Sequence, residues 1–132
     1  MITVELALRL RAAGLPWNPA SGDRFVIPDR GMDADVFVVS ELTVDVHEAP
    51  TGRLLRFNGT TERALDSVEQ EAVVWLPSEG QLRAALGPRF RRLEPVGDGF
   101  AVVISGPDGE ERHIDVDAER AYARALLTTL QP

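Results

Sequence analysis

Glycine and proline recur so often in this chain that every apolar segment between them is short, which limits the fold to short helices and strands. The 132 residues contain 11 glycines and 9 prolines, many in turn-forming pairs such as Asn58–Gly59 and Gly87–Pro88. No stretch approaches the roughly 18 consecutive apolar residues that a membrane helix needs. We therefore expect one globular domain, residues 1–132, with no membrane span and no export signal.

Three helices are predicted from their start and stop signals. Thr3 can cap a helix that Gly14 ends, and Ser78 can cap a helix over 79–86. A closing helix starts near Asp117 and carries an apolar stripe along one side. The members of that stripe are Ala118, Ala121, Tyr122, Ala125 and Leu126, with Leu127 and Leu130 beside it. Thr60 or Thr61 can cap a further short helix through residue 65.

The remaining apolar segments have the length and alternation of strands. Residues 43–57 predict a hairpin, and residues 90–116 predict a three-stranded meander with turns at 97–99 and 107–109. Further strands are expected at 24–28, 36–39 and 72–76. Because consecutive strands are joined by short turns, the sequence predicts an α+β fold. Its architecture is a mainly antiparallel sheet with N- and C-terminal helices against one face and a short helical insertion.

Composition narrows the partners and the chemistry. All 14 basic residues are arginine, and the net charge is −7, which opposes binding to phosphate backbones, so nucleic acid is an unlikely partner. The absence of lysine excludes Schiff-base chemistry and a phosphate-loop lysine. The absence of cysteine excludes disulfides and thiolate ligands and fits a cytoplasmic location. We expect no cofactor.

Two histidines lie in predicted strands beside carboxylates. His47 is flanked by Asp45 and Glu48, and His113 lies near Asp115. These groups could form a metal site or an acid/base pair, but neither histidine has a recognised ligand spacing, and a solvated strand face explains them better.

The other candidate sites also have simpler explanations. Asp29, Asp33 and Asp35 surround Gly31, but their spacing differs from that of an EF-hand calcium loop. Glu69 and Glu71 could supply paired carboxylates for hydrolysis, but they are better explained as solvent-exposed residues of a polar connection between a helix and a strand. No serine stands in a nucleophile elbow, and no phosphate cradle is present. The sequence predicts no catalytic residue, no cofactor-binding residue and no metal ligand.

Trp17 and Trp75 are the candidate interaction anchors. Each lies next to a proline-bearing turn, where an aromatic ring can be partly exposed. Core packing is the more common role of such residues, and a partner-binding anchor is the alternative.

Several stretches resemble a family of short actinobacterial proteins, some of which are labelled pilus assembly protein CpaE. The stretches include residues 22–25, Phe57–Thr61 and Trp75–Pro77, and the similarity extends to residues 119–127. The chain has neither the phosphate loop nor the lysine of a Walker-type ATPase. The resemblance implies no established activity and no catalytic residue.

Three functions are compatible with these observations. The leading hypothesis is a non-enzymatic interaction or regulatory module of the bacterial cytoplasm, which binds a protein partner or a second copy as a homodimer. The first alternative is a small enzyme or ligand-binding protein whose polar groups meet only in three dimensions. Its candidate residues are Asp23, Arg24, His47, Arg56, Glu62 and Arg63. The second alternative is an accessory protein of a pilus or secretion apparatus, from the resemblance alone.

Overall fold

The computed structural model describes residues 1–28, 32–39, 44–49, 52–57, 67–69 and 73–131. Its contacts divide the chain into two compact units. Unit 1 comprises Met1–Pro16 and Pro77–Pro132, and unit 2 comprises Trp17–Leu76. Unit 2 is thus inserted in the sequence of unit 1.

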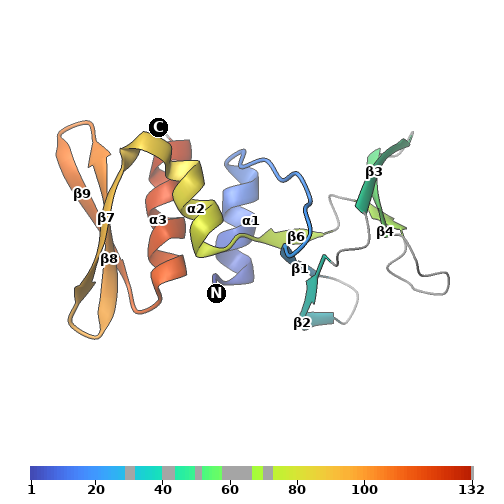
Figure 1. Cartoon of the computed structure of the whole chain (residues 1–132), viewed down its shortest axis with the longest axis horizontal. Helices are drawn as coiled ribbons and strands as arrows, with labels where there is room; N and C mark the ends of the chain where they lie inside the picture. Colours follow the sequence, from blue (N-terminus) through green and yellow to red (C-terminus); the bar gives the residue numbers. More distant parts are fainter. Residues whose placement is uncertain (29–31, 40–43, 50–51, 58–66, 70–72, 132) are drawn as a thin grey trace. The chain divides into compact units, whose positions relative to one another are not determined.

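Unit 1 contains three α-helices, a short 3-10 helix and three strands within its described residues (Figure 1). The helices are α1 (Val4–Ala12), α2 (Glu79–Leu86) and α3 (Ala118–Leu130), and the 3-10 helix η2 is Gly87–Arg89. The strands are β7 (Phe90–Val96), β8 (Gly99–Gly106) and β9 (Gly109–Asp115).

Side chains cap each of the three helices at the residue that the sequence predicts. Thr3 accepts a 3.1 Å hydrogen bond from the backbone N–H of Leu6, and Asp117 accepts one of 3.0 Å from Arg120. Ser78 and Gln81 form a reciprocal capping box. At the other end of α2, Gly87 adopts a φ of 58°, where a side chain would be strained. The predicted helix starts are confirmed.

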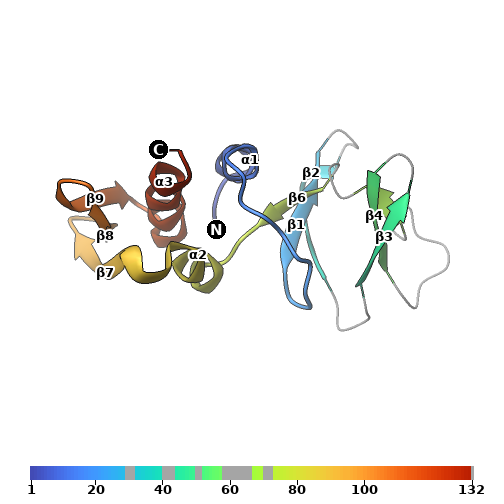
Figure 2. The ribbon, with the colours of Figure 1, turned by 90° about the horizontal axis from the view of Figure 1, so that it is seen from above.

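The strands of unit 1 form an antiparallel meander in the order β7-β8-β9. Helix α3 packs against β8 and β9, and α1 and α2 pack against α3, so the helices lie on one side of the sheet (Figure 2). The core of this unit is aliphatic, with Tyr122 as its largest member. Its other buried side chains include Leu6, Leu10, Leu82, Leu86, Val102, Ile104 and Leu126.

Unit 2 consists of strands. β1 (Arg24–Ile27) lies between β2 (Met32–Val38) and β6 (Val74–Leu76), and both pairs are antiparallel. A second sheet has the order β3-β4-β5, with β3 at Val44–Ala49, β4 at Gly52–Phe57 and β5 at Ser67–Glu69. The predicted hairpin over 43–57 is confirmed, since Val44 pairs with Phe57 and Ala49 pairs with Gly52.

The predicted α+β class, with antiparallel strands and helices near both ends, is confirmed. The strands are distributed over three sheets of three strands in the described part of the chain. Strand β5 was not expected, because three residues carry too little alternation to predict a strand. The short helix expected at 60–65 lies outside the described residues. No helix that the structure describes has the length and apolar character that crossing a bilayer requires.

Candidate functional site

Both predicted anchors, Trp17 and Trp75, belong to an aromatic cluster in unit 2. Phe25 pairs across the sheet with Phe37 on one side and Trp75 on the other, which places three aromatic residues in one row. Trp17 stacks on Trp75 with ring centroids 6.0 Å apart, and its ring lies 6.2 Å from that of Phe25. Such ring pairs stabilise a fold beyond the area they bury.

The two tryptophans differ in exposure and in hydrogen bonding. Trp17 is 8% exposed and donates from Nε1 to Asp23, whereas Trp75 is half-buried and its Nε1 is buried with no hydrogen-bond partner. A buried donor without an acceptor is costly. Trp75 therefore keeps more accessible surface than Trp17. The role of either residue as an interaction anchor stays a prediction.

The structure gives positions for some of the other predicted residues. His47 pairs with Leu54 and Arg56 with Asp45 in the β3-β4 hairpin, whose side chains are outside the described part of the structure. Asp29, Glu62, Arg63 and Glu71 lie outside the described residues. Asp23 is buried and accepts the hydrogen bond from Trp17, and Arg24 is half-buried in β1. Among the described residues, no group of three or more His, Asp and Glu residues is arranged to hold a metal ion.

His113 belongs to a polar row on β9, on the side of the sheet that α3 covers. At one end of this row, Asp115 lies 3.1 Å from the Arg120 guanidinium and 2.8 Å from that of Arg124, which ties β9 to α3. In the middle, His113 Nε2 lies 3.6 Å from Glu111 Oε2, is buried and has no hydrogen-bond partner. The row is thus partly structural, and Glu111 is its member nearest to a cleft.

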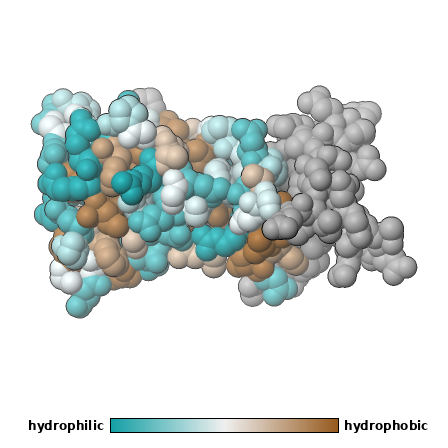
Figure 3. Space-filling view, viewed as in Figure 1, coloured by the Kyte–Doolittle hydropathy of each residue, from teal (hydrophilic) through white to brown (hydrophobic). Residues whose placement is uncertain are grey.

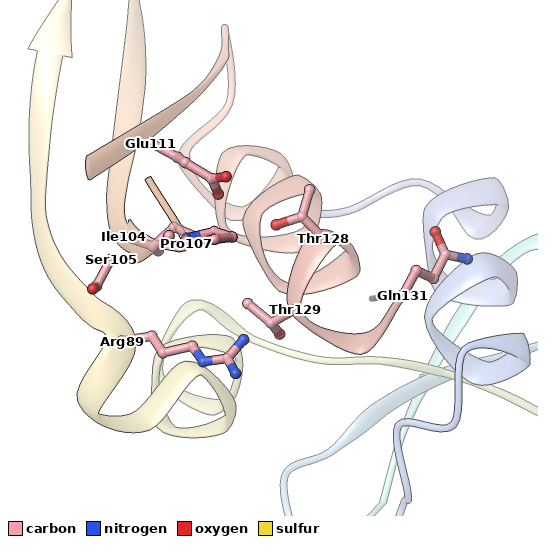
Figure 4. Close-up of a pocket in the computed structure, with 9 residues that line it drawn as sticks. Arg89, Ile104, Ser105, Pro107, Glu111, Thr128, Thr129 and Gln131 are labelled. Carbon is pink, nitrogen blue, oxygen red and sulfur yellow. The ribbon is translucent and has the colours of Figure 1, made fainter. Parts of the chain in front are cut away.

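A cleft of about 540 Å³ lies within unit 1, at the end of α3 (Figure 4). Its lining comes from η2, the β8-β9 hairpin and the last turns of α3. The polar residues that line it are Arg89, Ser105, Glu111, Thr128, Thr129 and Gln131. The volume is within the range of small-molecule sites.

The cleft contains none of the residues that the sequence suggested for a ligand site. Arg89, Ser105, Glu111 and Thr128 come from four separate elements, and none of them stands in a recognisable local motif. Only the tertiary fold brings these residues together.

The open face of the β7-β8-β9 sheet carries a ladder of charges. Arg92 lies 3.1 Å from Glu94 and 3.2 Å from Glu110, and Arg112 lies 3.0 Å from Glu94. The hydrogen bond from Arg92 is the main cause that lowers the pKa of Glu94. Hydrophilic side chains cover much of the face of unit 1 seen in Figure 3, with hydrophobic patches between them.

The two edges of this sheet differ. Strand β7 contains Pro95, which cannot donate a backbone hydrogen bond, and its pairing with β8 shifts register between Phe90 and Arg92. Strand β9 has no proline and pairs with β8 in unbroken register over all seven residues. Irregularities of the kind seen in β7 protect a sheet edge, and β9 has none of them.

Comparison with family models, with curated proteins and with solved structures found no match to this chain. The resemblance to short actinobacterial proteins stays a prediction.

Proposed function

We propose that the chain is a non-enzymatic interaction module of the bacterial cytoplasm, which forms a homodimer through the edge of β9. The observation that carries this proposal is the regular, proline-free edge of β9 beside the interrupted edge of β7. A regular edge strand presents unpaired N–H and C=O groups that a second strand can satisfy.

The hairpin that begins β9 decides which backbone groups face outward. Gly106 pairs with Gly109 across a two-residue connection, and such a connection is closed by a hydrogen-bonded pair. Hydrogen-bonded and non-hydrogen-bonded pairs then alternate along the ladder. The N–H and C=O groups of Glu110, Arg112 and Ile114 therefore point away from β8.

A two-fold axis beside Arg112, relating two copies of β9, would let these outward-facing N–H and C=O groups pair with each other. Two antiparallel copies of β9 would exchange hydrogen bonds at Arg112, and Glu110 of each copy would pair with Ile114 of the other. The same register sets Glu111 opposite His113 of the second copy. Moving the axis to His113 would set Glu111 opposite Asp115, which like charges disfavour.

Charge makes this dimer sensitive to salt. Each copy carries a net charge of −7, so two copies repel each other at long range. Salt screens that repulsion, and the Debye length falls to about 10 Å at 0.1 M ionic strength. Dimerisation through backbone pairing should therefore strengthen as salt is raised from a low concentration.

The test is sedimentation velocity over a range of protein concentrations, comparing Arg112→Pro with Arg112→Ala. Proline removes the backbone N–H of residue 112, which points away from β8. The hydrogen bonds between β9 and β8 stay intact, because residue 112 does not donate toward β8. Alanine keeps that N–H and removes the like charges that would face each other at the axis. We expect Arg112→Pro to be a monomer and Arg112→Ala to dimerise at least as well as the original chain.

Single cysteines test the register, since the chain has none of its own. Arg112→Cys should form an intermolecular disulfide, because residues opposite each other in paired strands have Cβ atoms about 5 Å apart. Arg92→Cys on β7 is the matched control and should stay reduced. A monomer at all concentrations and salt levels, or equal cross-linking of the two variants, would overturn the proposal.

A further inference from the structure

We propose that the cleft at the end of α3 binds a small zwitterion that carries one ammonium and one carboxylate group. The cleft shares Glu111 with strand β9, but this inference does not depend on the homodimer.

Arg89 supplies the positive side of the cleft. Its guanidinium has no carboxylate partner among the residues that the structure describes, whereas the neighbouring Arg91 and Arg92 are bonded to Pro88 and Glu110. In an acidic chain, an arginine that lines a cleft without a partner is available to a ligand carboxylate, which it can bind with two parallel hydrogen bonds. Ser105, at the end of β8, pairs with Glu110, so its side chain lies on the open face of the sheet and does not add to the donors of the cleft.

Glu111 supplies the negative side. Its carboxyl lies over Gly106, where an added Cβ would come within 2.5 Å of Glu111 Cδ. The absence of a side chain at Gly106 thus leaves room for Glu111. In Figure 4, Glu111 and Arg89 extend from opposite sides of the lining toward the last turns of α3.

The last turns of α3 add hydrogen-bond acceptors. The Thr128 hydroxyl donates 2.7 Å to the carbonyl of Ala125, and the Thr129 hydroxyl donates 2.8 Å to that of Leu126. Because both hydroxyl protons are used in this way, the two oxygens can only accept from a ligand. The C-terminal end of a helix also favours positive charge, and α3 has no basic residue in its last turn.

The cleft therefore offers hydrogen-bond donors at Arg89 and hydrogen-bond acceptors at Glu111, Thr128 and Thr129. A simple anion would satisfy the first set and leave the second without donors, and a simple cation would do the reverse. A molecule with a carboxylate at one end and an ammonium at the other satisfies both sets.

The experiment is a titration of the isotopically labelled chain followed by amide ¹H–¹⁵N spectra. The probes are glycine, 4-aminobutyrate and 6-aminohexanoate, which separate the two charges by increasing lengths. Two blocked compounds, 4-acetamidobutyrate and 4-aminobutyramide, each lack one charge. At least one zwitterion should shift the amides of Ser105, Gly106, Glu111 and Thr129 saturably, and blocking either end of 4-aminobutyrate should weaken its binding about tenfold, as the loss of one charged hydrogen bond does.

Variants assign the two ends of the ligand. Arg89→Gln should weaken zwitterion binding about tenfold and leave 4-aminobutyramide unaffected, because that compound has no carboxylate. Arg9→Gln makes the same charge change on the exposed side of α1 and should change neither affinity. Measurements in the Arg112→Pro background separate ligand binding from any change in dimerisation.

Three results would overturn the inference. One is the absence of saturable shifts at zwitterion concentrations of about 10 mM, well above a millimolar dissociation constant. Another is equal binding of zwitterions and blocked compounds. The third is binding of inorganic phosphate with no response to any zwitterion, which would indicate a simple anion site.

Discussion

The indole Nε1 of Trp17 donates a 2.8 Å hydrogen bond to Oδ2 of Asp23, and this carboxylate oxygen also accepts 3.0 Å from the backbone N–H of Ala20. Asp23 is 6% exposed. One buried carboxylate thereby fixes both the turn before β1 and the ring that stacks on Trp75.

Replacing Asp23 should destabilise the protein according to how many acceptors are lost. Asp23→Ala leaves the Trp17 and Ala20 donors without their acceptor and should lower the free energy of unfolding by about 2–3 kcal/mol. Asp23→Asn keeps one acceptor oxygen and should cost about 1 kcal/mol. Urea unfolding monitored by tryptophan fluorescence measures both. Asp35→Ala, an exposed aspartate of the same unit, is the control, and an equal loss there would contradict the role of Asp23.

The elements that the sequence predicted well are those with local physical causes. Thr3, Ser78 and Asp117 each satisfy an amide only three residues away, so the helix starts are visible in sequence. The hairpin turns are equally local. The predicted meander strand at 112–116 begins earlier, at Gly109, because Glu110 and Glu111 are polar residues whose strand conformation comes from pairing with β8.

The arrangement of the functional candidates could not be predicted in the same way. Trp17 and Trp75 meet because β6 pairs with β1, and nothing in the sequence specifies that pairing of distant strands. Arg89 and Glu111 likewise share a cleft only after β7, β8 and β9 have formed their sheet. The sequence pattern predicts strands and caps, but partners distant in sequence depend on the tertiary fold.

Asp115 should make stability depend on acidic pH. Desolvation is the largest influence and raises its pKa, but the hydrogen bonds from Arg124 and the Asp117 amide and the charges of Arg120 and Arg124 together hold the pKa below its ordinary value. The unfolded chain then binds more protons, so this contribution is complete above the unfolded pKa of about 3.9 and is lost as pH falls through the lower folded pKa.

The measurement is the melting temperature between pH 6 and pH 2, by roughly half-unit steps that bracket this window. Asp115→Asn should be less stable than the original chain at pH 6, and the difference should shrink toward the acid end. Glu94→Gln removes a carboxylate that also binds arginine but is more exposed, so its effect should be smaller. A difference for Asp115→Asn that does not change with pH would count against the ion-pair explanation.

Tyr122 should resist ionisation in the folded protein. Burial raises its pKa above the ordinary value, and Glu79 raises it further through its charge and a hydrogen bond. Because the chain has one tyrosine, absorbance at alkaline pH reports this side chain alone. Its stabilising contribution is complete below the unfolded pKa of about 10 and is lost as pH rises through the folded pKa.

The tyrosine titration should move toward its ordinary pKa in Glu79→Gln and reach it in denaturant. Glu5→Gln, which removes a carboxylate from the first turn of α1, should leave the titration unchanged. If the folded and unfolded chains titrate together, Tyr122 is accessible and the packing of Phe90 on its ring, at 5.7 Å, does not hold in solution.

Gly99 and Gly106 lie at the two ends of β8, and alanine should destabilise the protein much more at Gly99 than at Gly106. At Gly99 an added Cβ would lie 2.5 Å from the backbone oxygen of Asp115, and backbone that is paired in a sheet cannot move away cheaply. At Gly106 the nearest atoms belong to the flexible end of Glu111, which can turn aside. Gly99→Ala should therefore cost about 2–3 kcal/mol of unfolding free energy, as overpacking does, and Gly106→Ala less than about 1 kcal/mol. Chemical denaturation of the two variants gives these values. Gly106→Ala should also weaken zwitterion binding, because the added methyl group displaces Glu111, and a variant that keeps full affinity would contradict the role of Glu111 in binding the ligand.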